Sequence, residues 1–252
     1  MYCMRITVLG MILALSAFAP AVVGSEPTAA MIVIDDNDLT HGFDHAQHDR
    51  LVSMGYKVTL VEPHMLDSAF IKTVAENFDV LIVSESIASF DADPLIGTKV
   101  PMMHNESFSW DNFSFTTGTG YPDWVGGTTK IDIVNASHPI VVNANLTTGP
   151  LQFYIDSTVV DDRGRWSTDS YKVLAPGGEL IAQVEIYHKR DYQMVIFAID
   201  KDAELANGIK SPSRIVGFPL PGHEVLKASE ITDEAWTLWE SAIRWLDPKS
   251  DD

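Results

Sequence analysis

The chain has 252 residues, of which 46% are hydrophobic and 10% aromatic, which is enough for a large hydrophobic core. Its 17 basic and 35 acidic residues give a formal charge of −18, which argues against nucleic acid and anionic membrane surfaces as partners. The only cysteine is Cys3, so residues 25–252 have no thiol for a disulfide, a metal site or a nucleophile.

The first 24 residues have the pattern of a secretory signal peptide. Arg5 supplies the positive start, residues 6–19 are almost wholly apolar, and Val22-Val23-Gly24 fits a small-residue cleavage site. An uncleaved anchor is the alternative, although the apolar run is short for a membrane span. We therefore expect residues 25–252 to be secreted or periplasmic, to fold as a single domain, and to have no membrane partner after signal cleavage.

Residues 30–104 alternate between buried strands and amphipathic helices. Apolar runs at 30–34, 57–61, 78–83 and 100–103 predict four parallel strands. A helix ending at Gly55 and a second one capped near Asp67 lie between the first three. This alternation predicts an α/β fold, a three-layer flavodoxin-like sandwich whose ligands bind beyond the carboxyl ends of the strands.

The remaining segments extend this sheet. Residues 107–128 are rich in Gly, Thr, Ser and aromatic residues and predict a long loop. Strand-like pieces at 129–134, 151–155, 171–175, 179–186 and 193–199 predict an added antiparallel portion beside the mostly parallel sheet. Residues 213–218 have the texture of another buried strand. Thr232 is expected to cap a final amphipathic helix that Pro248 ends.

Polar side chains that follow the predicted strands form the candidate site. They are Asp35, Asp36, Glu85, His104, Asn105 and Glu106. Glu85, His104 and Glu106 are candidates for acid/base catalysis, because two carboxylates and an imidazole would meet at adjacent strand ends. Asp35 and Asp36 offer oxygen ligands to a divalent cation, together with His104. The alternative is that all these groups only satisfy backbone groups, cap helices or face water.

Two further groups of residues suggest binding. Trp110 and Trp124 are predicted to be partly exposed and to offer flat faces to a carbohydrate, with packing of the loop onto the domain as the alternative. His41, His45 and His48 would share one helix face and could bind a transition metal, with a solvated polar face as the alternative. Beyond a divalent cation, no cofactor is indicated, and the oligomeric state is left open.

The order of the segments resembles the class I glutamine amidotransferase-like superfamily and, within it, the branch related to trehalose-utilisation proteins. The resemblance rests on residues 31–36, 55–58 and 78–83, and on residues 214–218 before a Trp-rich helix. The turn that carries the family's cysteine nucleophile here contains His104-Asn105-Glu106, and Gly222-His223-Glu224 stands near the place of the family's His-Pro-Glu. The resemblance implies the fold and adds His223 as a ligand-binding candidate. The absence of a cysteine at this turn excludes glutamine hydrolysis by a cysteine thiolate.

Three functions are consistent with these patterns. The first is a secreted, thiol-free domain that binds or processes a carbohydrate or related small molecule at the strand ends. The second is a non-catalytic binding or scaffold domain that lost its nucleophile. The third is a divalent-metal-dependent hydrolase.

Overall fold

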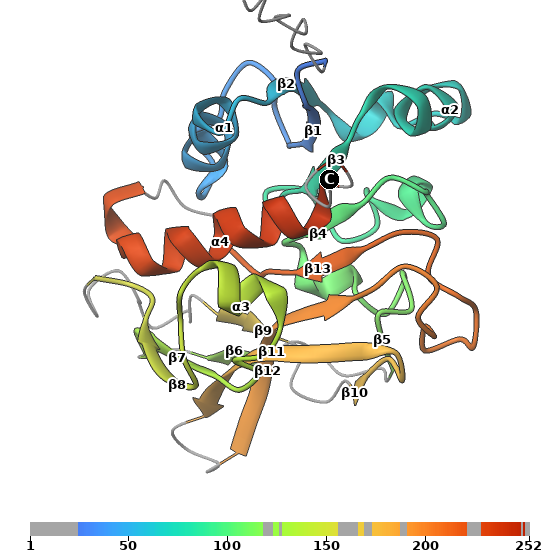
Figure 1. Cartoon of the computed structure of the whole chain (residues 1–252). Helices are drawn as coiled ribbons and strands as arrows, with labels where there is room; N and C mark the ends of the chain where they lie inside the picture. Colours follow the sequence, from blue (N-terminus) through green and yellow to red (C-terminus); the bar gives the residue numbers. More distant parts are fainter. Residues whose placement is uncertain are drawn as a thin grey trace, which may run out of the picture.

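The computed structural model describes residues 25–117, 123–125, 128–155, 166–168, 173–186, 191–220, 228–247 and 249. Its centre is a nine-stranded sheet (Figure 1). Five adjacent strands run parallel, in the spatial order β2 (Lys57–Val61), β1 (Thr28–Ile32), β3 (Val80–Val83), β4 (Met102–His104) and β13 (Ile215–Gly217). The predicted flavodoxin-like sandwich is confirmed.

Four antiparallel strands continue the same sheet beyond β13. They are β12 (Asp191–Ile199), β11 (Gly178–Ile186), β7 (Lys130–Ile133) and β8 (Gly149–Gln152). The predicted antiparallel addition is therefore confirmed. One of its expected members is not part of it, because β10 (Val173–Leu174) pairs with β5 (Thr116–Thr117) in a separate small sheet.

Side chains that alternate along β1 enter two different cores. Ala29 and Met31 join one hydrophobic cluster, whereas Ala30 and Ile32 join the other. The first core is covered by α1 (Asp44–Ser53), α3 (Pro139–Asn143) and α4 (Asp233–Leu246), and residues of α2 (Ser68–Asn77) pack against the second (Figure 1). A strand that is buried on both faces has to be apolar, as residues 29–32 of β1 are.

The loop predicted at residues 107–128 is partly wrong. This stretch contains the 3₁₀ turn η3 (Ser107–Ser109), β5, and β6 (Asp123–Val125), which pairs with β9 (Trp166–Thr168). The fourth parallel strand also begins later than predicted, at Met102. Pro101 precedes it and has no N–H to donate to the ladder. The described residues also form the 3₁₀ turns η1 (Pro63–Met65), η2 (Asp93–Leu95) and η5 (Ala228–Glu230).

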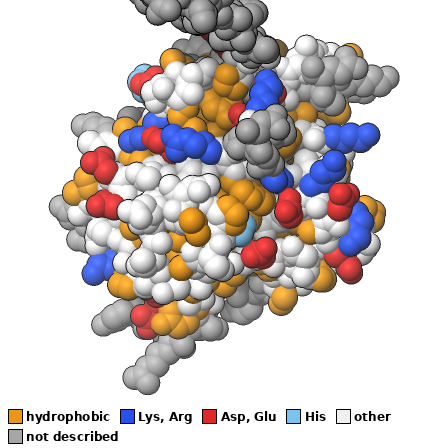
Figure 2. Space-filling model, in the orientation of Figure 1, with side chains coloured by type: hydrophobic (Ala, Val, Ile, Leu, Met, Phe, Trp, Pro, Cys, Tyr) orange, Lys and Arg blue, Asp and Glu red, His pale blue; other side chains and the backbone are white. Residues whose placement is uncertain are grey.

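Charged side chains of both signs are interspersed on the face shown in Figure 2. In the part of the chain that the structure describes, no helix is long and apolar enough to cross a membrane. The predicted signal peptide, residues 1–24, lies outside that part.

Candidate functional site

The strand order reverses at β1, because the chain passes from β1 to β2 on one side and then to β3 on the other. Doubly wound sheets form a ligand crevice at such a switch point, outside the carboxyl ends of the strands. The loops that leave β1 and β3 are joined there, since Ile34 N donates a 3.2 Å hydrogen bond to Ser86 Oγ. This edge of the sheet is the candidate functional site.

A set of buried polar side chains, here called the strand-end cluster, ties α1 to this edge. Its members are Asp44, Gln47, Ser84, Ser86 and Asn105, all of them buried. Ser84 Oγ donates to the carboxylate of Asp44 at 2.5 Å and accepts a 2.9 Å bond from Ser86 N. Asn105 Nδ2 donates to Gln47 Oε1 at 2.7 Å. The cluster thus links the first turns of α1 to the residues that follow β3 and β4.

One acceptor in the strand-end cluster is unsatisfied. Asn105 is fully buried, and its main-chain N donates to Val83 O at 2.8 Å. Its side-chain Oδ1 accepts no hydrogen bond from any residue that the structure describes. A buried acceptor that lacks a donor destabilises the fold by about 1–3 kcal/mol. A bound water or a ligand group with a donor hydrogen is therefore expected at this atom.

Burial also changes the acidity of the cluster. Removal of Asp44 from water raises the pKa of its carboxyl to about 6, and hydrogen bonding by the Ser84 and Ser86 hydroxyls offsets only part of that rise. The positive charge that His41 can carry lowers the pKa of Asp44 slightly. Asp44 consequently changes its charge close to neutral pH, where acid/base groups of enzymes often titrate.

His104 ends β4 and is fully buried. Its ring packs edge-on against Phe113 and Phe115, with centroid distances of 4.7 and 5.8 Å, and its Nε2 lies 3.2 Å from Ser109 Oγ. Burial lowers the pKa of His104 to about 3, so the imidazole is neutral at physiological pH. His104 can form hydrogen bonds there, but it cannot supply a positive charge.

The two glutamates predicted beside His104 are also buried, with side chains at most 2% exposed. Glu85 is the second residue after β3. Glu106 precedes η3, and its Oε1 accepts a 2.8 Å hydrogen bond from Phe108 N. Glu106 therefore has a structural task as the cap of η3. The acid/base role of Glu85, His104 and Glu106 stays a prediction.

The predicted exposure of Trp110 is wrong. The η3 turn folds the indole back over the sheet, where it is fully buried, packs at 4.8 Å from the Phe197 ring and donates from Nε1 to His104 O at 3.2 Å. A ring in this position supports β4 and offers no face to solvent. The side chain of Trp124 and the whole of His223 lie outside the described residues.

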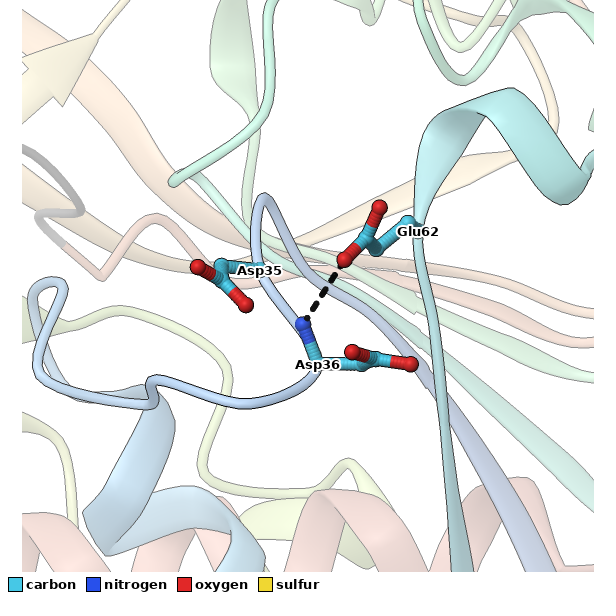
Figure 3. Close-up of side chains that lie close together, drawn as sticks. All are labelled: Asp35, Asp36 and Glu62. Atoms are coloured by element: carbon cyan, nitrogen blue, oxygen red, sulfur yellow. Dashed lines mark hydrogen bonds between the residues drawn. The ribbon is translucent and has the colours of Figure 1, made fainter.

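Asp35 and Asp36 lie near Glu62 at the ends of β1 and β2 (Figure 3). One carboxylate oxygen of each lies within 4.8 Å of the others, and Asp36 N donates to Glu62 Oε1 at 3.3 Å. The predicted partner of the two aspartates was His104, whose ring is instead held among phenylalanines of the second core. Carboxylate oxygens suit Mg²⁺ or Ca²⁺ rather than a transition metal, and water would have to complete the coordination shell.

The predicted histidine face is not formed as expected. α1 begins at Asp44, so His41 lies before the helix, while His45 and His48 each place Nδ1 within 3.3 Å of the Asp49 carboxylate. Among the described residues, the group of three potential metal ligands is Asp35, Asp36 and Glu62, without these histidines.

The sequence patterns did not single out Glu62, nor the two buried polar residues of α1, Asp44 and Gln47. Asp44 and Gln47 share one helix face with Leu51, at spacings of three and seven residues, and this face is buried in the structure. Polar residues on the apolar face of a short helix were the available signal. The signal is weak, because only the tertiary contacts with Ser84 and Asn105 show that both side chains are paired.

No family model matches the chain, and no curated protein matches it. Among solved structures, a ThuA-like protein from Bacteroides uniformis aligns over 92% of this chain and 97% of its own, with 11% identity and a TM-score of 0.48. A ThuA-like protein from Parabacteroides merdae aligns over 89% and 90%, with 10% identity and a TM-score of 0.46. Similarity at this level is not evidence for an activity or a ligand. Inferences about both therefore rest on the residues of this chain.

Proposed function

We propose that the chain is an exported, thiol-free domain that binds a small polyhydroxylated molecule, such as a carbohydrate, at the strand-end cluster. The observation that carries the proposal is Asn105 Oδ1, a fully buried acceptor to which no described residue donates, beside the switch point of a doubly wound sheet. A ligand hydroxyl would satisfy this acceptor.

The chemistry of the cluster favours a neutral polyol over an ion. Its groups are two amides, two hydroxyls and one carboxyl whose pKa is raised by burial. Amides and hydroxyls both donate and accept, which suits sugar hydroxyls that also do both. The formal charge of −18 disfavours anionic ligands over the molecule as a whole.

A thermal-shift screen with sugars, oligosaccharides and divalent cations tests this proposal, because a ligand of the folded state raises the melting temperature by mass action. For the best sugar, we expect Asn105→Asp to weaken binding at least tenfold, since it places a carboxylate against Gln47 Oε1. The exposed Asn143 supplies the matched control Asn143→Asp, which should bind as the original chain does. Equal affinity in both variants, or no stabilising sugar, would contradict the proposal.

Processing of the bound molecule is tested with a panel of glycans and esters. If Glu85 and Glu106 act as acid and base, Glu85→Gln and Glu106→Gln should each lower turnover by about 10²–10⁴-fold. Turnover that survives in both variants would remove these residues from the mechanism. A chain that binds a sugar but turns over no substrate is the non-catalytic binding domain.

The second candidate function is divalent-cation dependence, favoured by the proximity of Asp35, Asp36 and Glu62 (Figure 3). Isothermal titration with Mg²⁺, Ca²⁺ and Mn²⁺ of protein purified without a histidine tag tests it. We expect Asp36→Asn to abolish saturable binding and Asp49→Asn, an exposed change on α1, to leave it intact. Absence of saturable binding in the unmodified chain would rule the second candidate out.

A further inference from the structure

A cavity of about 250 Å³ opens into the second core, apart from the strand-end cluster. Met102 of β4 and Ile215 of β13, which are paired in the sheet, lie at its floor with the rings of Phe113 and Phe115. No member of the strand-end cluster lines it. The cavity is thus a separate site, at the beginnings of strands whose ends carry the candidate polar site.

The mouth of this cavity is apolar and exposed. Ile96 and Ile209 line it and have exposed fractions of 49% and 62%. Two isoleucines held in water at the rim of an apolar cavity keep an unfavourable surface that a bound apolar group would cover. Scattered surface isoleucines are ordinary, but these two frame the same opening.

The segment that carries Ile209 is held in place by backbone hydrogen bonds. Leu205 N donates to Ile209 O at 2.8 Å, Gly208 N to Leu205 O at 2.9 Å, and Ser211 N to Ala203 O at 2.8 Å. These bonds close a tight hairpin over residues 203–211. The opening therefore exists before a ligand binds, which lowers the entropy cost of binding.

The described lining of the cavity carries a single basic side chain, against the negative charge of the chain as a whole. Lys210 is the one charged side chain among the described residues that line the cavity, although the chain has 35 acidic and only 17 basic residues. An ammonium beside an apolar cavity suits a ligand with an apolar body and one anionic group. Lys210 is exposed, so it can meet such a group at the rim.

We propose that this cavity binds a small monocarboxylate, with its apolar body against Phe113, Phe115 and Met102 and its carboxylate at Lys210. The volume is that of roughly eight water molecules at about 30 Å³ each, which fits a body the size of a medium-length alkyl chain. The proposal is independent of the polyol site, because the two share no lining residue.

Isothermal titration with octanoate, below its critical micelle concentration, tests the proposal. We expect saturable binding of one octanoate per chain and an affinity that falls about fourfold for each methylene removed, in heptanoate and hexanoate. Octanol should bind about two- to fivefold more weakly than octanoate, since it has the same chain without the charge.

Two variants with matched controls locate the binding site. Ile209→Ser should weaken octanoate about fivefold or more, whereas Val142→Ser, at an equally exposed position on α3, should not. Lys210→Gln should remove the preference for octanoate over octanol, whereas Lys201→Gln, an exposed lysine outside this cavity, should keep it.

Several outcomes would overturn the proposal. No saturable octanoate binding, or binding that Ile209→Ser leaves unchanged, would exclude the cavity as its site. Equal affinities of the chain for octanol and octanoate would exclude the role of Lys210. If the chain binds no octanoate but sediments with phosphatidylglycerol vesicles, and Ile209→Ser abolishes this sedimentation, the two isoleucines would instead belong to a membrane-binding surface.

Discussion

Asp44 shows how a side chain's neighbours decide its chemistry. A carboxyl in the first turn of a helix usually faces solvent and is charged. Here α1 is turned so that Asp44 lies under the ends of the strands and is hydrogen-bonded by Ser84. The loss of hydration outweighs this bond, and the pKa rises to about 6.

The raised pKa of Asp44 predicts a specific pH dependence of stability. The carboxyl keeps its proton up to a higher pH in the folded chain than in the unfolded chain. The stabilisation of the folded state that results is fully present below about pH 4 and is lost as the pH rises through 6. Between pH 4 and pH 7, the free energy of unfolding of the original chain should fall by up to about 3 kcal/mol more than that of Asp44→Asn. Urea denaturation at both pH values measures this difference. Glu185→Gln, an exposed control on β11, should follow the original chain, and parallel profiles for Asp44→Asn would disprove the assignment.

At the scale of elements, α4 is the helix that the sequence predicts best. Its apolar face recurs at helical spacing, and the structure buries nine of its side chains, including Trp236 and Trp239. The predicted cap is confirmed, since Thr232 Oγ1 accepts from Ala235 N at 3.2 Å. The same hydroxyl donates to Gln152 O at 2.6 Å and so fixes the helix start to the end of β8.

Loss of this cap should destabilise the whole chain. Thr232→Ala removes both hydrogen bonds and should lower the free energy of unfolding by about 1–2 kcal/mol. Thr232→Ser retains the hydroxyl and should recover most of that loss. Urea denaturation of the three proteins measures the effect. A Thr232→Ser protein as unstable as Thr232→Ala would show that the methyl group, rather than the cap, is responsible.

At the scale of the molecule, the parallel and antiparallel parts share their cores. β13 pairs with β4 on one side and with β12 on the other. Each hydrophobic cluster contains residues of both parts: Met31 and Val195 in one, Ile32 and Phe197 in the other. Neither part can lose its packing without exposing apolar surface of the other.

This shared packing predicts one cooperative unfolding transition. Far-ultraviolet circular dichroism and tryptophan fluorescence should give coincident urea curves, as expected of a single domain. Phe197→Ala should shift both curves together, by about 3–5 kcal/mol, because it leaves a cavity between β12 and the Trp110 ring. Phe90→Ala, with a ring that is 68% exposed, is the control and should shift neither. Separate transitions would show two domains.

The sequence by itself determined the fold class and the order of strands and helices over residues 30–104. Continuous apolar runs and helical spacing depend on residues close together in the chain. For this reason the sequence predicts β2 (Lys57–Val61) and the N-cap of α4, Thr232, to the residue. It also placed His104, Asn105 and Glu106 at a strand end.

Only the tertiary structure decided which polar groups meet: Glu62 with Asp35 and Asp36, and Gln47 with Asn105. The tertiary structure also decided that the Trp110 side chain is buried. Such pairings depend on how strands and helices far apart in sequence are packed, and local patterns contain no record of that packing.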